Sequence, residues 1–273
     1  MYRSAMEQLN KWKQKTNKKP LIIRGARQVG KTWLMKEFGK TAYEKAVYIN
    51  FDNNPQMKEL FSLDMRIDRI IMGIELYVGH KISPHNTLLI FDEVQEVPKA
   101  LSSLKYFNET APEYQIVCAG SLLGIALHQG TSFPVGKVEF MDLYPLSFTE
   151  FMRAMGKEQF VDLLDKGDFE MATMFRQDYV DLLKYYYYVG GMPEVVQSFV
   201  DNRDFNEARE IQERILAAYE QDFSKHAPNE VVPRIRMLWN SIPAQLLRRT
   251  RSLSTVSSKR VPGQRITKRR LCG

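Results

Sequence analysis

The chain has 273 residues, of which 44% are hydrophobic, so it is long enough to bury a large core and we expect two domains. Its two cysteines, Cys118 in an apolar run and Cys272 near the C-terminus, exclude a disulfide framework and a cysteine metal site. The N-terminal region lacks an apolar signal core, and no run approaches the ~20 apolar residues of a membrane span. We therefore expect a cytoplasmic protein without a membrane partner.

The net charge of +7, with a pI near 9.2, is distributed unevenly. Residues 248–273 carry nine Lys and Arg and no acid. The charge of this segment, +9, exceeds the net charge of the whole chain. Residues 1–247 are therefore slightly acidic and lack the domain-wide basic footprint of a non-specific duplex binder. Nucleic acid as a partner of a local patch stays open.

The first strong motif follows a polar N-terminal helix that we place in residues 1–20. Residues 21–32 read LIIRGARQVGKT and match the pattern Gly-x-x-x-x-Gly-Lys-Ser/Thr without a mismatch. Leu21 to Ile23 predict a buried strand, and a helix near 32–39 directs its positive end at an anion. Lys31 would reach the β/γ-phosphates and Thr32 would offer its hydroxyl to Mg²⁺. The pattern predicts a loop that binds a nucleoside triphosphate through Gly25, Ala26, Arg27, Gln28, Val29, Gly30, Lys31 and Thr32.

A second motif lies sixty residues farther along, after a predicted strand at 46–52 and a predicted helix at 56–79. Residues 88–93 read LLIFDE, an apolar strand that ends in two acids and has the form of a Walker B segment. Asp92 would help to hold Mg²⁺, and Glu93 would polarise the attacking water as the base. One strand between the two Walker segments is typical of the P-loop branch with an additional catalytic glutamate.

Two further strands complete the predicted sheet, after a helix at 98–109. Residues 115–121 read QIVCAGS, a buried strand with a polar tip, and 138–143 alternate as the last strand. Ser121 is a candidate sensor of the γ-phosphate. The Gly-Ser pair is equally typical of a turn or a helix cap, and both interpretations stay open.

These motifs together resemble a known family, the bacterial and archaeal AAA-type ATPases that carry a C-terminal domain of unknown function. The resemblance extends in order from about residue 5 to 246. It implies an ATP-binding core that hydrolyses ATP, a helical lid and the start of a winged-helix segment, but no substrate. The matching segments are IIRGARQVGKT at 22–32, FDEVQ at 91–95, AGSLL at 119–123, VEF through LYPLSF at 138–148, and GGMPEVV at 190–196.

The sequence from Phe148 onward predicts helices. Apolar residues at steps of three or four from Phe205 to Lys225 indicate one buried helix face. Four consecutive tyrosines, 185–188, resemble a base-stacking platform, but they would point in all directions around a helix, so we interpret most of them as packing residues. The expected fold is α/β, a P-loop NTPase with a doubly wound parallel sheet of the additional-strand branch. We expect an N-terminal helix at 1–20, the ATPase core at 21–147, a helical lid with the winged-helix start at 148–247, and a basic tail at 248–273.

The tail has no helical or strand period, and it has three interpretations. It is a nucleic-acid-binding arm, a disordered terminus, or the product of a shifted reading frame. Codon degeneracy permits the residues after Leu246 to be reread as the lysine-rich helix-turn-helix opening that the resembling family places there. We favour the shifted frame, which would make the chain a truncated member of that family.

Two classes of function fit the motifs. In the first, Lys31, Thr32, Asp92 and Glu93 assemble MgATP, and hydrolysis changes the angle between core and lid. In the second, ATP binding orders a switch or scaffold with negligible turnover, with or without nucleic acid. The complete Walker pair favours the enzyme. Arg24, Arg27, Arg153 and Lys137 lack the diagnostic features of an arginine finger. If a neighbouring subunit of a homo-oligomer supplies the finger, we expect the isolated chain to hydrolyse ATP slowly.

Overall fold

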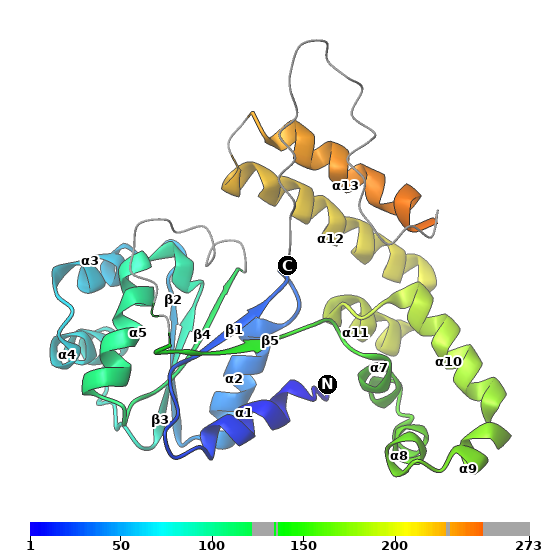
Figure 1. The fold of residues 1–273 in the computed structure, drawn as a ribbon, viewed down its shortest axis with the longest axis horizontal. Helices are drawn as coiled ribbons and strands as arrows, with labels where there is room; N and C mark the ends of the chain where they lie inside the picture. Colours follow the sequence, from blue (N-terminus) through cyan, green and yellow to red (C-terminus); the bar gives the residue numbers. More distant parts are fainter. Residues whose placement is uncertain (122–133, 135, 228–229, 248–273) are drawn as a thin grey trace. The chain divides into compact units, whose positions relative to one another are not determined.

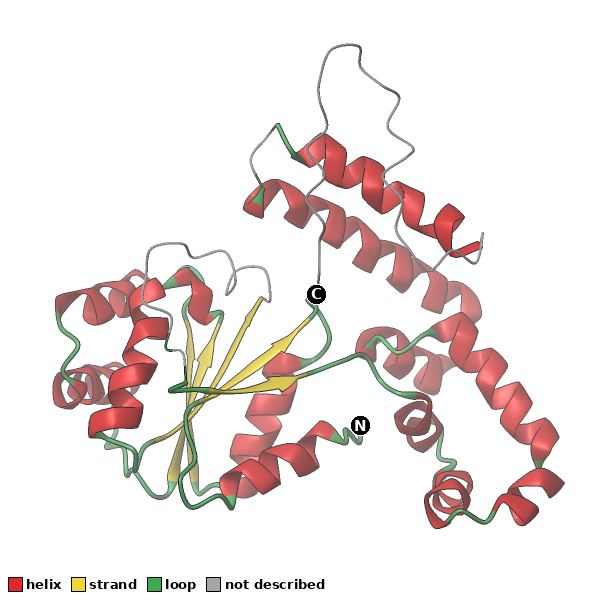
Figure 2. Ribbon diagram, in the orientation of Figure 1, coloured by secondary structure: helices red, strands yellow, loops and turns green. Residues whose placement is uncertain are grey.

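The computed structural model of the chain describes residues 1–121, 134, 136–227 and 230–247 (Figure 1). The chain divides into two compact units, Met1–Ile215 and Leu216–Gly273. The first unit contains a five-stranded sheet with its flanking helices and, after the last strand, a wholly helical region (Figure 2). The second begins within a long helix. In the described part of the chain, every helix is too short or too polar to cross a membrane.

The sheet is parallel throughout and has the strand order β2-β3-β4-β1-β5. β4 lies between β1 and β3, so the strand after Walker B is adjacent to it, as the sequence predicts. This order confirms the predicted α/β P-loop NTPase fold. The strands are β1 (Leu21–Gly25), β2 (Lys45–Asn50), β3 (Thr87–Asp92), β4 (Gln115–Ser121) and β5 (Glu139–Asp142).

Helices cover both faces of the sheet (Figure 1). The predicted single helix at 56–79 is wrong, because the chain breaks at Asp64, whose backbone is extended. The Asp64 carboxylate accepts hydrogen bonds from the Arg66 amide and the Arg69 guanidinium, which stabilise the turn instead. One face carries α1 (Ala5–Lys13) and α2 (Lys31–Ala42), and the other carries α3 (Pro55–Leu63), α4 (Ile67–Val78) and α5 (Pro98–Thr110).

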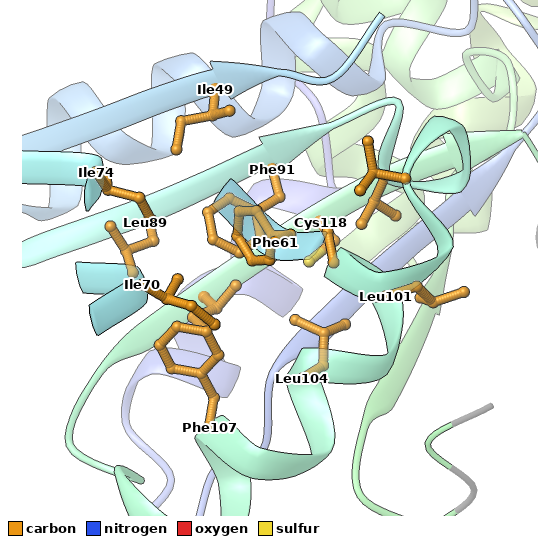
Figure 3. Packing of buried hydrophobic residues seen from close by; sticks show 14 of the residues in the cluster. Ile49, Phe61, Ile70, Ile74, Leu89, Phe91, Leu101, Leu104, Phe107 and Cys118 are labelled. Atoms are coloured by element: carbon orange, nitrogen blue, oxygen red, sulfur yellow. The ribbon is translucent and has the colours of Figure 1, made fainter. Parts of the chain in front are cut away.

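Two hydrophobic layers hold these helices to the sheet. On the face of α1 and α2, Phe38 packs edge-on against Trp12. On the opposite face Phe91 of β3 contacts the rings of Phe61 and Phe107 (Figure 3). Its ring also packs edge-on against that of Phe51. Each fully buried Phe contributes ~1.5–3 kcal/mol of transfer free energy, and edge-to-face pairs add to it. Because Phe91 directly precedes Asp92, this packing fixes the end of β3 where the predicted metal ligand lies.

The helical region begins at Ser147, which caps α7 (Phe148–Ala154). Ser147 Oγ accepts from the Glu150 amide, and the Glu150 carboxylate accepts from the Ser147 amide, so the two residues form a capping box. The region continues through α8 (Glu158–Lys166), α9 (Phe169–Met174), α10 (Arg176–Val189), α11 (Pro193–Asn202) and α12 (Phe205–His226).

Three of the four tyrosines of α10 contact other aromatic rings, although Tyr185 and Tyr188 stay partly exposed. The Tyr186 ring lies 5.4 Å from that of Phe151. Tyr185 and Tyr188 both contact the Phe205 ring and are 41% and 50% exposed, whereas Tyr187 is 76% exposed.

The second unit contains the C-terminal half of α12 and α13 (Val232–Leu247). Tyr219 and Phe223 of α12 pack on the ring of Trp239, with centroid distances of 6.1 and 5.4 Å. The basic tail at 248–273 lies outside the described residues.

Candidate active site

The glycine-bracketed loop lies between the carboxyl end of β1 and the N-terminus of α2. Gly30 caps α2 with φ at 94°, a left-handed conformation that favours glycine. At Gly25 a Cβ atom would stand 2.3 Å from the Leu143 carbonyl oxygen, so a larger residue would displace the chain after β5. Gln28 also has a positive φ, at 62°. The loop backbone is therefore closely packed against the chain after β5. The first amides of α2 have no partner within the helix and are available to bind an anion.

Lys31 is the first residue of α2 and is 9% exposed. Its Nζ donates to the Gly25 and Ala26 carbonyl oxygens, at 2.9 and 2.8 Å. Burial lowers the pKa of Lys31, while the nearby carboxylates of Glu93 and Asp92 act in the opposite direction. The ammonium group is thus held inside the loop beside both acids of the Walker B segment.

Asp92 ends β3 and is 3% exposed. Its Oδ2 accepts from Thr32 Oγ1 at 2.7 Å and from the Tyr48 hydroxyl at 2.9 Å, and its Oδ1 accepts from the Glu93 amide at 3.1 Å. Burial, and then the Asp92 charge, raise the pKa of Tyr48, so this hydroxyl stays protonated as a donor. The structure therefore joins Thr32 and Asp92, the two residues that the sequence assigned to a metal.

This pair fits Mg²⁺. A hydroxyl and a carboxylate oxygen are the hard ligands that Mg²⁺ accepts, and Mg²⁺ in nucleotide sites takes its other ligands from phosphate and water. Thr32 Oγ1 and Asp92 Oδ2 are 2.7 Å apart, close enough for adjacent positions of one octahedron. The described residues contain no group of three or more His, Cys, Asp and Glu side chains that could hold a metal without such help.

Glu93 lies in a left-handed turn with φ at 53°, between β3 and the 3₁₀ turn η1 (Val94–Glu96). For a residue other than glycine this conformation costs ~1 kcal/mol or more, and such positions cluster at functional sites. Its Oε2 accepts from the Gln95 side-chain amide at 2.6 Å, and Gln95 is buried. The Gln95 amide therefore restrains the Glu93 carboxylate at the end of β3.

The remaining sequence candidates are distributed differently. Ser121 is the last residue of β4, paired with Gly25 across the sheet, but its side chain and the chain after it lie outside the described residues. Arg24 makes two 2.9 Å bonds to the Asp142 carboxylate, Arg153 pairs with Asp165, and Lys137 pairs with Glu109. Arg27 is exposed within the loop and also has a partner.

Two residues of the site, Tyr48 and Gln95, are not predicted by the sequence motifs. Tyr48 lies in β2 beside Ile90 of β3, and its side chain extends to the strand end. An aromatic hydroxyl two residues before the end of a strand that borders Walker B is a signal that could have identified it. Gln95 belongs to the FDEVQ segment, but the sequence motifs assign it no role in the site.

Two family models match the sequence. An AAA domain matches residues 17–152, and a domain of unknown function matches residues 180–264. The second match includes part of the basic tail. No curated protein sequence matches the chain significantly.

Several solved structures have a similar fold at low sequence identity. The Walker-type ATPase of Pyrococcus abyssi is 15% identical, with a TM-score of 0.46, over 91% of this chain and 76% of that one. DnaA of Aquifex aeolicus bound to AMPPCP is 16% identical, with a TM-score of 0.44, over 81% of this chain and 68% of that one. Drosophila ORC bound to DNA is 14% identical, with a TM-score of 0.42, over 78% and 66%.

Proposed function

The chain belongs to the AAA-type P-loop ATPase family in which a domain of unknown function follows the AAA domain, and we propose that it binds MgATP and hydrolyses it. The observation that carries this proposal is the junction of Lys31, Thr32, Asp92 and Glu93 at the ends of β1 and β3. These four groups supply phosphate charge compensation, two metal ligands and a base.

Binding would begin at the loop. The amides at the start of α2 would donate to the phosphates, and the helix dipole would favour their negative charge. Lys31 would exchange its two carbonyl partners, Gly25 and Ala26, for β- and γ-phosphate oxygens. Because the ammonium is already desolvated, a charge-assisted bond to phosphate loses little further hydration.

Thr32 Oγ1 and Asp92 Oδ2 would hold Mg²⁺ in this arrangement. When bound, the ion neutralises charge on the phosphates and orients them for in-line attack. Tyr48 would keep its hydrogen bond to Asp92, so the carboxylate would retain its orientation when Thr32 offered its hydroxyl oxygen to the metal.

Glu93 would accept a proton from, or orient, the attacking water. The Gln95 amide fixes the carboxylate through Oε2 and leaves Oε1 for the water. Hydrolysis would then change the angle between the core and the helical lid that begins at Phe148, because the chain after β5 packs on Gly25 of the loop.

A second candidate function is a nucleotide-dependent switch or scaffold with negligible turnover. It is favoured by the ion pairs of Arg24, Arg153 and Lys137, which occupy these cations within the chain. For the ATPase, an arginine from another copy of this chain would complete the site. A local nucleic-acid contact is compatible with either function.

Turnover of the wild-type protein and Glu93→Gln distinguishes the two candidates. For an ATPase we expect Glu93→Gln to retain the ATP affinity measured by calorimetry and to lose phosphate release by about 10²-fold. Asp92→Asn serves as a matched carboxylate-to-amide control, because it should weaken Mg²⁺ dependence instead. Equal phosphate release by wild type and Glu93→Gln would favour the switch.

A further inference from the structure

Arg3 makes a buried ion pair beside the phosphate-binding loop that the reaction outlined above does not use. Its side chain is 6% exposed and lies 3.3 Å from the Glu150 carboxylate, which is equally buried. Among the described residues, the ion pairs that Lys15, Arg24, Arg66, Arg69, Lys81, Lys137, Arg153, Lys184, Arg209 and Arg214 make each have at least one side chain that is 40% exposed or more. Burying two charges is expensive unless their remaining hydrogen-bonding groups are also satisfied.

The Arg3 guanidinium satisfies that condition by joining three segments. Nη1 donates to the Val29 carbonyl of the loop at 3.2 Å, and Nη2 donates to the Tyr144 carbonyl after β5 at 2.5 Å. Nε donates to Glu150 at the start of α7. The planar fork of arginine is needed here, because a lysine ammonium cannot address three acceptors in these directions.

The two other acceptors of Arg3, the Glu150 carboxylate and the Tyr144 carbonyl, are themselves held in place. Glu150 also accepts from the Ser4 amide at 2.7 Å and from the Ser147 amide at 2.9 Å. The chain after Tyr144 is fixed by the Leu146 amide, which donates to the Gly191 carbonyl at 2.7 Å. Arg3 is thus attached to a rigid base and acts on the loop.

The contact with Val29 sets the direction of the next amide. A trans peptide unit is planar, so its C=O and N–H point to opposite sides. While Arg3 holds the Val29 oxygen on its own side, the Gly30 N–H is directed to the other side. Gly30 is also near, because a Cβ there would lie 3.8 Å from Arg3 Nη1 and 3.6 Å from the Pro193 ring at the start of α11.

We propose that Arg3 is a positioning residue of the phosphate site, which orients the Val29–Gly30 peptide so that the Gly30 amide faces the β-phosphate of a nucleotide. This inference rests on the proposed function. It also assigns a role to the Arg3–Glu150 pair as the physical link from the loop to the first lid helix. Arg3 contacts no phosphate itself and acts through the loop backbone.

Arg3→Lys is the first test variant, because it keeps the charge beside Glu150 and loses the fork that reaches Val29. We expect its melting temperature to stay within a few degrees of wild type and its affinity for ADP, measured by calorimetry, to fall about 10-fold. Amide hydrogen exchange in residues 29–32 should accelerate. Arg69→Lys, in an exposed ion pair on α4, is the matched control. It should change neither the ADP affinity nor the amide exchange in residues 29–32.

A second variant separates positioning from stability if Arg3→Lys folds poorly. Arg3→Met/Glu150→Gln removes both buried charges and retains a capping-box residue at 150. We expect it to melt at a higher temperature than Arg3→Met and still to bind ADP about 10-fold more weakly than wild type. If every folded Arg3 variant binds ADP with wild-type affinity, the positioning role of Arg3 is overturned and the proposed function stands. Failure of the wild-type protein to bind ADP or ATP would overturn the proposed function, and this inference with it.

Discussion

The Tyr48 hydroxyl and Thr32 Oγ1 donate to the same oxygen, Oδ2 of Asp92, at 2.9 and 2.7 Å. One donor belongs to β2 and the other to α2, so two separate elements hold the carboxylate. Thr32 would turn to the metal when Mg²⁺ binds, and Tyr48 would then be the side chain that keeps Asp92 in place.

We expect Tyr48→Phe to raise the Mg²⁺ concentration needed for half-maximal ATP hydrolysis by about 10-fold, the usual effect of losing a residue that orients a metal ligand. The ring remains, so the fold should not change. Tyr43→Phe is the matched control, because the Tyr43 hydroxyl donates to Gln115 and not to Asp92. An unchanged Mg²⁺ dependence in Tyr48→Phe would show that Thr32 and the backbone suffice to orient Asp92.

Lys31→Met should separate binding from stability. Burial lowers the pKa of Lys31, which means that the folded protein disfavours the charged form. An apolar side chain of similar length removes that cost, so the melting temperature should hold or rise. Nucleotide affinity should fall by about 10- to 100-fold, because a charge-assisted phosphate contact is lost. Calorimetry with ATP and a thermal melt measure the two effects, and retained ATP affinity would contradict the loop assignment.

Gln95→Ala should slow hydrolysis without weakening ATP binding. Gln95 donates a 2.6 Å hydrogen bond to the proposed base, Glu93, whose backbone already lies in a left-handed turn. Without this partner the carboxylate samples other rotamers, and we expect a roughly 10-fold lower rate of phosphate release, within the range of positioning effects in general-base catalysis. Faster phosphate release would instead mean that the hydrogen bond from Gln95 keeps the Glu93 carboxylate away from the attacking water.

The sequence predicted those parts of the site that are local along the chain. The loop from Gly25 to Thr32 and the acids that end β3 are contiguous motifs, and their strands have the pattern of buried parallel strands. Tyr48 and Asp92 are 44 residues apart, and Arg3 and Glu150 are 147 apart, so only the folded topology brings them together. The break at Asp64 was missed for a similar reason, since helical periodicity continues on both sides of a turn that side-chain hydrogen bonds stabilise.

Gly191→Ala should destabilise the helical lid. A Cβ at this position would stand 2.3 Å from the Leu146 carbonyl oxygen and 3.0 Å from its amide, and both are backbone atoms that cannot move aside cheaply. Relief requires a shift of the chain after β5 or of α11, at a cost of about 1–3 kcal/mol by analogy with overpacked cores. Urea unfolding measures this cost.

Gly156→Ala is a control for the same substitution in open space. Gly156 has φ at 72°, and a Cβ at this position would meet no heavy atom within 4 Å, so the variant should lose only about 1 kcal/mol from the left-handed backbone. If Gly191→Ala loses no more than Gly156→Ala, the close approach of α11 to the chain after β5 does not contribute to stability.

Removal of residues 248–273 tests the interpretation of the basic tail. These residues have no apolar period, so they offer little surface to bury and cannot offset the entropy of ordering. We expect the shortened chain to keep its melting temperature and ATP affinity, and to lose only a salt-sensitive attraction to polyanions that nine cations would produce. The second family match extends to residue 264, which makes the opposite result informative. A melting temperature lower by several degrees would mean that the tail is a packed part of the domain, and the shifted-frame interpretation would fail.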